Sequence, residues 1–366
     1  MAPPLVLHVL PVDLARGAQT YARELRDALD GADVRHRTVT LFHSDAAALR
    51  ADWSLAVPDG RLRRLGLDPR VRHRLRELLR VERPAVVVAH GGEPLKYVAA
   101  AGVEPARLAY YKIGIGGERL RGVSGHVHRR VLARAGVAAT VSDDAAAELV
   151  ALGLARDHVT VIPNGRDPSV YRPRSDGVPG NPTATVRLAF VGHLSTSKRP
   201  ERFVELVRRL RADGRAVEAV IAGDGPLLAE LRAQASEGVE VLGRVDDVPA
   251  VLATADAFVF TSVPEGEGMP GVLIEASLAG LPVVTTDVPG ARAVVVDGET
   301  GFVVPVDDFD ALVRATAALV DDPAGRARLG AAGRARASDR FGLATSVAAW
   351  RDLLAAMMAG QCASST

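Results

Sequence analysis

Short apolar runs alternate with stretches of helical periodicity along this 366-residue chain. Runs bounded by Gly, Pro and Asp predict buried strands. In the first half these strands are predicted at residues 5–10, 38–42, 85–90, 107–113, 137–141 and 159–163. In the second half they are predicted at 186–191, 218–222, 239–242, 257–260 and 282–285. The alternation of strands and helices, with few hairpin signals, predicts the α/β class with parallel sheets covered by helices on both faces.

Amphipathic helices are predicted between the strands and at the end of the chain. They cover residues 18–29, 143–152, 200–212, 227–235, 271–279, 309–320, 324–338 and 344–358. A Pro-rich segment separates the two series of strands; it carries Pro163, Pro168, Pro173, Pro179 and Pro182. We therefore predict two Rossmann-like domains, at residues 1–170 and 186–343, joined by a linker at 171–185.

The segment from 257 to 276 is the most informative for function. A buried strand ending at Phe260 leads into a Gly- and Pro-rich loop with Glu267, and a helix carrying Glu275 follows. Pro270 suits the first turn of that helix, and the amide groups of a helix N-terminus favour a phosphate. Carboxylates accept hydrogen bonds from hydroxyl groups, so the segment fits a nucleotide-sugar. From the residues alone, a structural loop with solvated glutamates explains the pattern equally well.

The spacing of Glu267 and Glu275, with seven residues between them, resembles the E-x7-E motif of retaining glycosyltransferases of the GT-B fold, family 4 (glycosyl transferases group 1). Glu267-Gly268-Met269-Pro270 is similar to the family's E-G-M-P, and residues 280–284 are similar to its next strand. The resemblance implies two Rossmann-like domains that face a central cleft, with the acceptor on the N-terminal domain and the donor on the C-terminal one. It implies that Glu267 contacts the donor sugar, that Glu275 holds the ribose, and that the last helix, 344–360, packs back on the N-terminal domain.

A second motif follows the strand at 186–191, where Gly192 and His193 lead to Lys198. Only three of the 45 basic residues are lysines, so a retained lysine can be one whose compact ammonium group is needed. Lys198 can stabilise the departing diphosphate. The family pattern G-R-L-x-x-x-K matches at Gly192 and Lys198, but His193 stands where the family has Arg. We predict Lys198, Glu267 and His90 as catalytic residues.

The other predicted site residues follow from their places at strand ends and from the resemblance. His90 ends a strand and is expected to face the sugar or the acceptor. The predicted donor-binding residues are Gly17, Gly192, His193, Arg244, Gly268, Met269, Pro270 and Glu275. The predicted acceptor-binding residues are Glu93, Lys96 and Lys112. For Gly17, the alternative to donor binding is a simple turn. For His193, the alternative is a side chain that faces the solvent.

Three further patterns are predicted to be structural. Asn164-Gly165 is expected to form a turn at the hinge. Asp308-x-Asp310 is a metal-binding pattern in another glycosyltransferase fold, but its place before a helix favours capping. His126 and His128, with the arginines around them, are expected to form a solvated basic helix.

Composition excludes several classes of function. The net charge of +1 and pI near 8.0 give no electrostatic footprint for nucleic acid. The single cysteine, Cys362, excludes a disulfide framework and a cysteine metal site, and we expect no bound metal or other cofactor. The chain shows neither a signal peptide nor a transmembrane span, so we expect a soluble cytoplasmic protein.

These observations predict a retaining glycosyltransferase of the hexosyltransferase type. It moves a sugar from a nucleoside-diphosphate sugar, with a UDP-sugar favoured, to the hydroxyl or amine of a small molecule or glycan. Two alternatives remain open: a nucleotide-sugar epimerase of the same fold, and a non-catalytic sugar- or nucleotide-binding protein. The sequence makes no prediction of oligomeric state.

Overall fold

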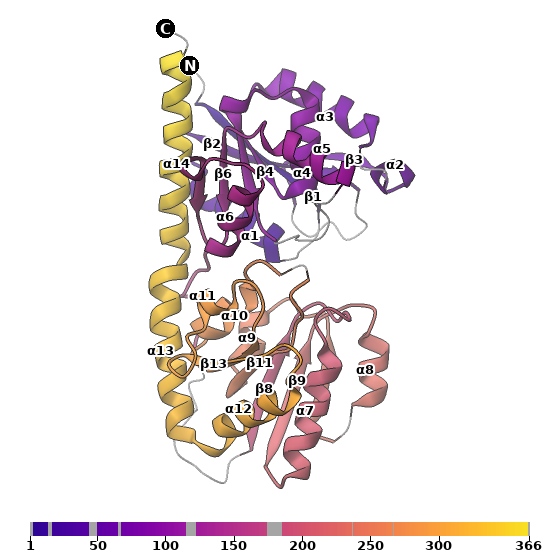
Figure 1. Cartoon of the computed structure of the whole chain (residues 1–366), viewed down its shortest axis with the longest axis vertical. Helices are drawn as coiled ribbons and strands as arrows, with labels where there is room; N and C mark the ends of the chain where they lie inside the picture. The colour runs from indigo at the N-terminus through magenta and orange to yellow at the C-terminus, as the bar shows by residue number, and fades with distance from the viewer. Residues whose placement is uncertain are drawn as a thin grey trace. The chain divides into compact units, whose positions relative to one another are not determined.

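The computed structural model describes residues 3–13, 17–43, 50–64, 67–114, 122–173, 185–235, 237–265 and 267–364. The chain divides into two compact units (Figure 1). Unit 1 comprises Met1–Gly165 and Leu343–Thr366, and unit 2 comprises Arg166–Gly342. Most of the linker predicted at 171–185 falls on residues 174–184, which lie outside the described residues. The linker therefore stays a prediction.

Unit 1 is built on a seven-stranded sheet in the order β3-β2-β1-β4-β5-β6-β7. Every pair of neighbours is parallel, as the alternation of strands and helices predicts. The strands are β1 (Leu5–Val12), β2 (Arg35–Phe42), β3 (Trp53–Val57), β4 (Val86–His90), β5 (Leu108–Lys112), β6 (Val137–Thr140) and β7 (Val159–Val161). The edge strand β3 was not predicted, because its apolar residues alternate with exposed ones over only five positions.

Helices cover both faces of this sheet. They are α1 (Gly17–Leu29), α2 (Arg61–Arg64), α3 (Pro69–Glu82), α4 (Gly92–Ala101), α5 (Gly122–Leu132), α6 (Asp143–Ala151) and α14 (Leu343–Ser364), with 3-10 turns η1 (Pro105–Arg107) and η2 (Arg156–His158). Residues such as Leu7, Val39 and Val87 form one core with α3 and α4. Because strand side chains alternate, Val6, His8 and their neighbours face the other way, toward α1 and α14.

The C-terminal helix α14 is held to unit 1 by a buried aromatic cluster. The indole N–H of Trp350 donates to Tyr21 Oη at 3.0 Å, and the ring meets Tyr111 edge-on at 5.1 Å. Tyr21 Oη also lies 2.5 Å from Ser346 Oγ. Figure 1 shows α14 running along this unit. The helix thus completes the core of unit 1 although it is far from β1 in sequence.

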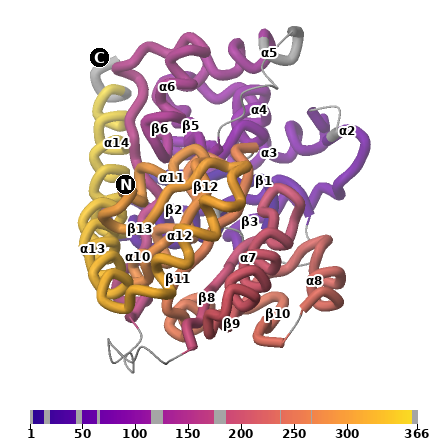
Figure 2. Tube along the Cα trace, turned by 60° about the horizontal axis from the view of Figure 1, so that its bottom comes forward, coloured from indigo at the N-terminus to yellow at the C-terminus, as the bar shows by residue number. Residues whose placement is uncertain are grey.

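Unit 2 is built on a six-stranded parallel sheet in the order β10-β9-β8-β11-β12-β13. The strands are β8 (Val186–Val191), β9 (Val217–Ala222), β10 (Val239–Gly243), β11 (Ala257–Phe260), β12 (Val283–Thr286) and β13 (Gly301–Val304). The helices are α7 (Pro200–Ala212), α8 (Leu228–Gln234), α9 (Val248–Leu252), α10 (Gly271–Leu278), α11 (Ala291–Val294), α12 (Phe309–Asp321) and α13 (Pro323–Phe341). Figure 2 shows α7 along β9 and α8 beside β10. The short elements α9, α11 and β13 were not predicted.

The loop between β12 and α11 packs against the loop that precedes α10. Gly290 has φ of +75°, and a Cβ there would lie 2.3 Å from Gly268 O and 2.7 Å from Met269 Cα. Only glycine permits this backbone approach. The loop that carries Gly268 and Met269 is therefore held in place by a neighbour that lacks a side chain.

Every helix in the described part of the chain is too short or too polar to span a lipid bilayer.

We expect Trp350→Ala to destabilise unit 1 by about 3–5 kcal/mol, because it removes a fully buried ring and leaves a cavity. Both tryptophans of the chain, Trp53 and Trp350, lie in unit 1. The fluorescence of Trp53 during urea unfolding therefore measures this unit. Arg351→Ala, an exposed change on the same helix, should stay within about 0.5 kcal/mol of wild type. Equal stability of the two variants would contradict the packing described for α14.

A second comparison separates backbone strain from loop packing. Gly298 also has φ of +75°, but a Cβ there meets nothing within 4 Å. Gly298→Ala should cost about 1–2 kcal/mol from strain alone, whereas Gly290→Ala should cost about 3 kcal/mol or more because it also displaces a backbone. Urea unfolding followed by far-UV circular dichroism measures the difference. If the two variants lose equal free energy of unfolding, the loop before α10 moves aside without resistance.

Candidate functional site

The centre of the candidate site is an ion pair between Lys198 and Glu267. Lys198 Nζ contacts Glu267 Oε1, and their side chains are 25% and 7% exposed. Lys198 follows β8 and Glu267 follows β11, and these two strands are neighbours in the sheet. Their carboxyl ends therefore meet at one edge, where ligands bind in open α/β sheets. The structure thus brings together two of the three predicted catalytic residues.

Two hydroxyl side chains after β11 fix this geometry. Thr261 Oγ1 lies 2.8 Å from Lys198 O and 2.9 Å from Arg199 O, which joins the loop after β11 to the loop after β8. Ser262 Oγ lies 2.5 Å from Glu267 Oε1 and 3.0 Å from Ser197 O. Sequence reasoning missed both hydroxyls. The available signal was their place directly after a buried strand, at the edge where the site forms.

Glu275 lies on the helix α10, and its partner is Arg166, the residue that follows the predicted Asn164-Gly165 turn. Arg166 Nε donates to Glu275 Oε1 at 2.8 Å, and the two side chains are 2% and 15% exposed. A Cβ at Gly271 would lie 2.8 Å from Arg166 Nη2, so the guanidinium group also approaches the first residue of the helix. Arg166 therefore sets the orientation of Glu275.

The N-terminus of α10 carries no side-chain cap. Pro270 precedes the helix as its N-cap and lies one position earlier than the first turn in which it was predicted. Proline has no side-chain acceptor for the leading amide groups, and these groups are the ones that bind anions at helix N-termini. Gly268, Met269 and Pro270 are all buried.

The loop with Gly192 is shaped by a second glycine that was not predicted. A Cβ at Gly223 would lie 1.8 Å from Gly192 O, so the loop after β9 can pack here only because residue 223 is glycine. His193 is exposed, next to Gly192. Arg244 is also exposed, directly after β10.

His90 ends β4 in unit 1, and its side chain is buried among the described residues. Its Nε2 lies 2.9 Å from His8 Nδ1, and its ring meets Tyr111 edge-on at 5.6 Å. Burial lowers the pKa of His90 to about 3. At neutral pH this histidine therefore acts as a neutral imidazole, not as a cation.

The predicted acceptor residues are largely engaged with protein partners. Glu93 on α4 accepts two hydrogen bonds of 2.9 Å from Arg63. Lys112 is buried at the end of β5, with its Nζ 3.0 Å from Glu148 Oε2. Lys96 on α4 is partly exposed. Gly17 is the first residue of α1, on the carboxyl side of β1.

Lys112 and Lys96 lie close enough to His128 to change its pKa, although this histidine was expected to be solvated. Burial has the largest effect on the pKa of His128 and lowers it. The positive charges of Lys112 and Lys96 lower this pKa further, and the negative charge of Glu148 raises it. The prediction of a fully solvated helix is therefore wrong for His128, whereas His126 is exposed as expected. A Cβ at Gly92, the first residue of α4, would lie 3.8 Å from His128 Cε1, so the ring lies against this helix.

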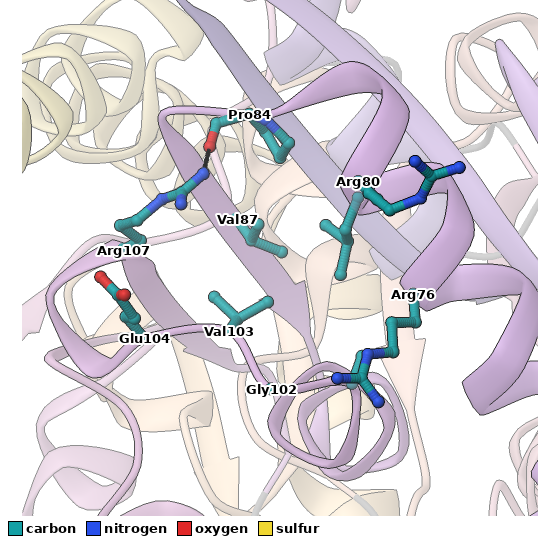
Figure 3. A pocket seen from close by; sticks show the side chains of 10 residues that line it. Arg76, Arg80, Pro84, Val87, Gly102, Val103, Glu104 and Arg107 are labelled. Carbon is teal, nitrogen blue, oxygen red and sulfur yellow. Dashed lines mark hydrogen bonds between the residues drawn. The ribbon is translucent and has the colours of Figure 1, made fainter.

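A cavity of about 260 Å³ lies elsewhere in unit 1 (Figure 3). Arg76, Arg80, Glu104 and Arg107 line it, and Arg107 donates to Pro84 O. The cavity reaches β4 near its amino end, opposite to the end that carries the buried histidine. Because no predicted site residue lines this cavity, it is not the candidate site.

The acidic pair before α12 is a cap, as predicted. Asp308 accepts a hydrogen bond from the amide of Ala311 at 2.7 Å. Within the described ranges, no three His, Cys, Asp or Glu side chains are placed to hold a metal ion. The Asn164-Gly165 turn has a buried contact, in which Tyr111 Oη donates to Asn164 Oδ1 at 2.7 Å.

The model described as Glycosyltransferase Family 4 matches residues 15–170, and the model described as Glycosyl transferases group 1 matches residues 185–322. The chain is 28% identical, over 45% of its length, to an Escherichia coli UDP-Gal:alpha-D-GlcNAc-diphosphoundecaprenol alpha-1,3-galactosyltransferase, of which 46% is covered. It is 38% identical, over 37% of its length, to a Mycolicibacterium smegmatis GDP-mannose-dependent alpha-(1-6)-phosphatidylinositol monomannoside mannosyltransferase, of which 38% is covered. The chain thus spans less than half the length of these two curated relatives.

The fold is similar to that of Anabaena HepE, solved in complex with UDP and glucose. The TM-score is 0.77 at 19% identity, and the superposition covers 96% of this chain and 99% of the other. This likeness shows the fold alone, and it confirms the predicted GT-B fold. The two family models match most of both units, and the E-x7-E spacing predicts the same family. The chain belongs to glycosyltransferase family 4, whose members are retaining enzymes.

Proposed function

We propose that this chain transfers a hexosyl group, with retention, from a nucleoside-diphosphate sugar to an acceptor hydroxyl or amine. A UDP-sugar is the favoured donor. The observation that carries the proposal is the contact of Lys198 with Glu267 at the carboxyl edge of the unit 2 sheet, in the loop that leads into α10. The ammonium group of Lys198 and the uncapped N-terminus of α10 suit a diphosphate, and the carboxylate of Glu267 can accept hydrogen bonds from sugar hydroxyls.

The ion pair gives Lys198 a partner that the ligand can replace. Glu267 holds the ammonium group of Lys198 in an ion pair. A bound diphosphate offers more oxygen acceptors and more negative charge than one carboxylate, so Lys198 turns to the phosphate and Glu267 becomes available to a sugar hydroxyl. Negative charge grows on the diphosphate as the sugar leaves, and a fixed ammonium stabilises that transition state. The amides at the start of α10 add to this effect.

Glu275 is proposed to bind the ribose of the nucleotide. Arg166 occupies its Oε1, and its Oε2 is proposed to accept from a ribose hydroxyl. The ion pair with a nearly buried guanidinium fixes the carboxylate before the ligand arrives, which reduces the entropy cost of binding. Arg244 and Gly192 are proposed to lie near the nucleotide, and His193 takes the place of the family's arginine.

The transfer itself needs no covalent enzyme intermediate in this proposal. The bond from the anomeric carbon to the phosphate oxygen breaks as the acceptor oxygen or nitrogen bonds to the same face of that carbon. The acceptor's proton passes to the departing phosphate oxygen, so charge and atoms balance. His90 is proposed to contact the sugar or the acceptor as a neutral ring. Gly17, Glu93, Lys96 and Lys112 are proposed to bind donor or acceptor from unit 1.

The decisive test measures both binding and turnover. Isothermal titration with UDP, GDP, ADP and dTDP, with and without EDTA, identifies the nucleotide, since the two relatives above are named for UDP and GDP donors. We expect tight binding of UDP that EDTA does not change. The matching UDP-sugars are then incubated with and without acceptors, and nucleotide release that depends on an acceptor supports transfer. An epimerised sugar without nucleotide release, or binding without turnover under any condition, would replace this proposal by one of the alternatives.

We expect Lys198→Met to lower the rate of transfer by about 10²- to 10³-fold, the effect of removing one donor to a developing anion. Steady-state kinetics measures the change. Lys198→Arg keeps the charge and should recover part of the rate. Arg208→Met removes an exposed cation on α7 and should change nothing. A Lys198→Met variant that is folded and has wild-type turnover would remove this residue from the mechanism.

The role of Glu275 is tested with an altered ligand. If Glu275 holds the ribose, UDP should bind about 10-fold or more tightly than 2′,3′-dideoxy-UDP, because a hydrogen bond to a carboxylate is lost. In Glu275→Gln this preference should shrink, while the affinity for the dideoxy ligand changes little. Calorimetry gives all four dissociation constants. An unchanged preference in the variant would show that the ribose binds elsewhere.

A further inference from the structure

Three histidine rings form a hydrogen-bonded row across the unit 1 sheet. His8 Nδ1 lies 2.9 Å from His90 Nε2, and His8 Nε2 lies 3.1 Å from His36 Nδ1. The three residues lie on the adjacent strands β2, β1 and β4, all on the face that α1 and α14 cover. All three side chains are buried. The row ends with His90 at the carboxyl end of β4, the edge where α/β sheets bind ligands.

The row is not arranged as a metal site. Its nitrogens face one another in pairs and do not point at a common centre, with neighbouring ring centroids 5.2 and 5.4 Å apart. No group of three possible metal ligands exists in the part of the chain that the structure describes. The nitrogens therefore serve as hydrogen-bond partners for each other.

All three rings are neutral at physiological pH. Burial lowers the pKa of His90 to about 3 and that of His36 to about 4, and it lowers the pKa of His8 well below its usual value. A neutral imidazole has one N–H donor and one bare nitrogen acceptor. The charged side chains that act on the row are Asp30, which raises the pKa of the histidine on β2, and Arg37 and Arg26, which lower the pKa values of the histidines on β2 and β1.

Three neutral rings can form these two bonds in only two ways. In the first, His90 Nε2–H donates to His8 Nδ1 and His8 Nε2–H donates to His36 Nδ1. His90 Nδ1 is then a bare acceptor. In the second, every donor is reversed and His90 carries its proton on Nδ1. The tautomer of one ring therefore sets the tautomers of the other two.

The state of His90 Nδ1 selects between the two arrangements. This nitrogen is buried, and the described residues give it no hydrogen-bond partner. A buried N–H without a partner is rarer in proteins than an under-used acceptor. The first arrangement leaves only an unused lone pair at His90 Nδ1, so it is the favoured one. That lone pair is the one hydrogen-bonding position of the ring that no described residue fills.

We propose that His8 and His36 are positioning residues that hold His90 in its Nε2–H tautomer, so that His90 Nδ1 accepts a hydrogen bond from a sugar hydroxyl. The identity of the ligand rests on the proposed function. The tautomer does not, because it follows from the row itself. A reversed row would make Nδ1 a donor, which cannot accept from a hydroxyl group.

The first test reads the tautomer directly. Long-range ¹H–¹⁵N correlation spectra of the ¹⁵N-labelled full chain distinguish Nδ1–H from Nε2–H imidazoles, and His90→Gln assigns the ring. We expect the Nε2–H form for His90 and for His8. A His90 that carries its proton on Nδ1 overturns the inference. The spectrum needs neither donor nor acceptor, so this result is independent of whether the chain proves to be a glycosyltransferase.

The second test asks whether the row acts on transfer. His8→Leu removes both bonds, so His90 should lose its fixed tautomer and kcat should fall about 10-fold, the loss expected of one hydrogen bond. His8→Asn places an amide oxygen near the position of Nδ1 and should recover the tautomer and most of the rate. UDP affinity should stay unchanged in both variants, because the proposed nucleotide site lies in unit 2.

Thr40→Val is the matched control for packing. Thr40 lies on the same face of β2 as His36 and is buried, and its hydroxyl group has no hydrogen-bond partner among the described residues. We expect it to keep the wild-type tautomer and rate. If His8→Leu matches Thr40→Val in both the His90 tautomer and kcat, the row has only a packing role and the inference is wrong.

Discussion

The candidate site depends on one ion pair, in which a lysine and a glutamate from neighbouring strand ends neutralise each other at the edge of a parallel sheet. The Glu267 side chain is only 7% exposed, so its charge is acceptable there because Lys198 and Ser262 both contact it. Ligand binding is then an exchange of partners. In the proposed function Lys198 turns from the carboxylate to a phosphate, while Ser262 and a sugar hydroxyl keep Glu267 hydrogen-bonded.

This exchange requires a backbone that does not move with the side chains. Thr261 joins the two loops by contacting carbonyl groups, and Gly223 and Gly290 allow other loops to pack directly on backbone. None of these residues carries charge. They determine where Lys198 and Glu267 lie, and placement to within a fraction of an ångström is what an electrostatic site needs.

Local pattern was sufficient to predict the parallel sheets, because strand and helix periodicity is contained in each short segment. Local spacing and the family resemblance singled out Lys198 and the two glutamates, and their roles stay predictions. Local pattern was not sufficient for the partners. Arg166 meets Glu275 across 109 positions of sequence, and the histidine row exists only because β1 lies between β2 and β4 in the sheet. Strand order is set by the packing of whole helices and cannot be read from the periodicity of single segments. The predicted linker falls mostly outside the described residues.

The scarcity of lysine has a practical consequence for labelling chemistry. Of the three lysines, Lys112 is buried against Glu148, Lys96 is partly exposed on α4, and Lys198 is one quarter exposed in the candidate site. Reagents that acylate side-chain amines therefore have few targets on this chain, and one of these targets is Lys198, the residue proposed to bind the diphosphate. Attachment of dyes or solid supports through lysine would risk blocking that site, whereas the abundant guanidinium groups would remain unmodified.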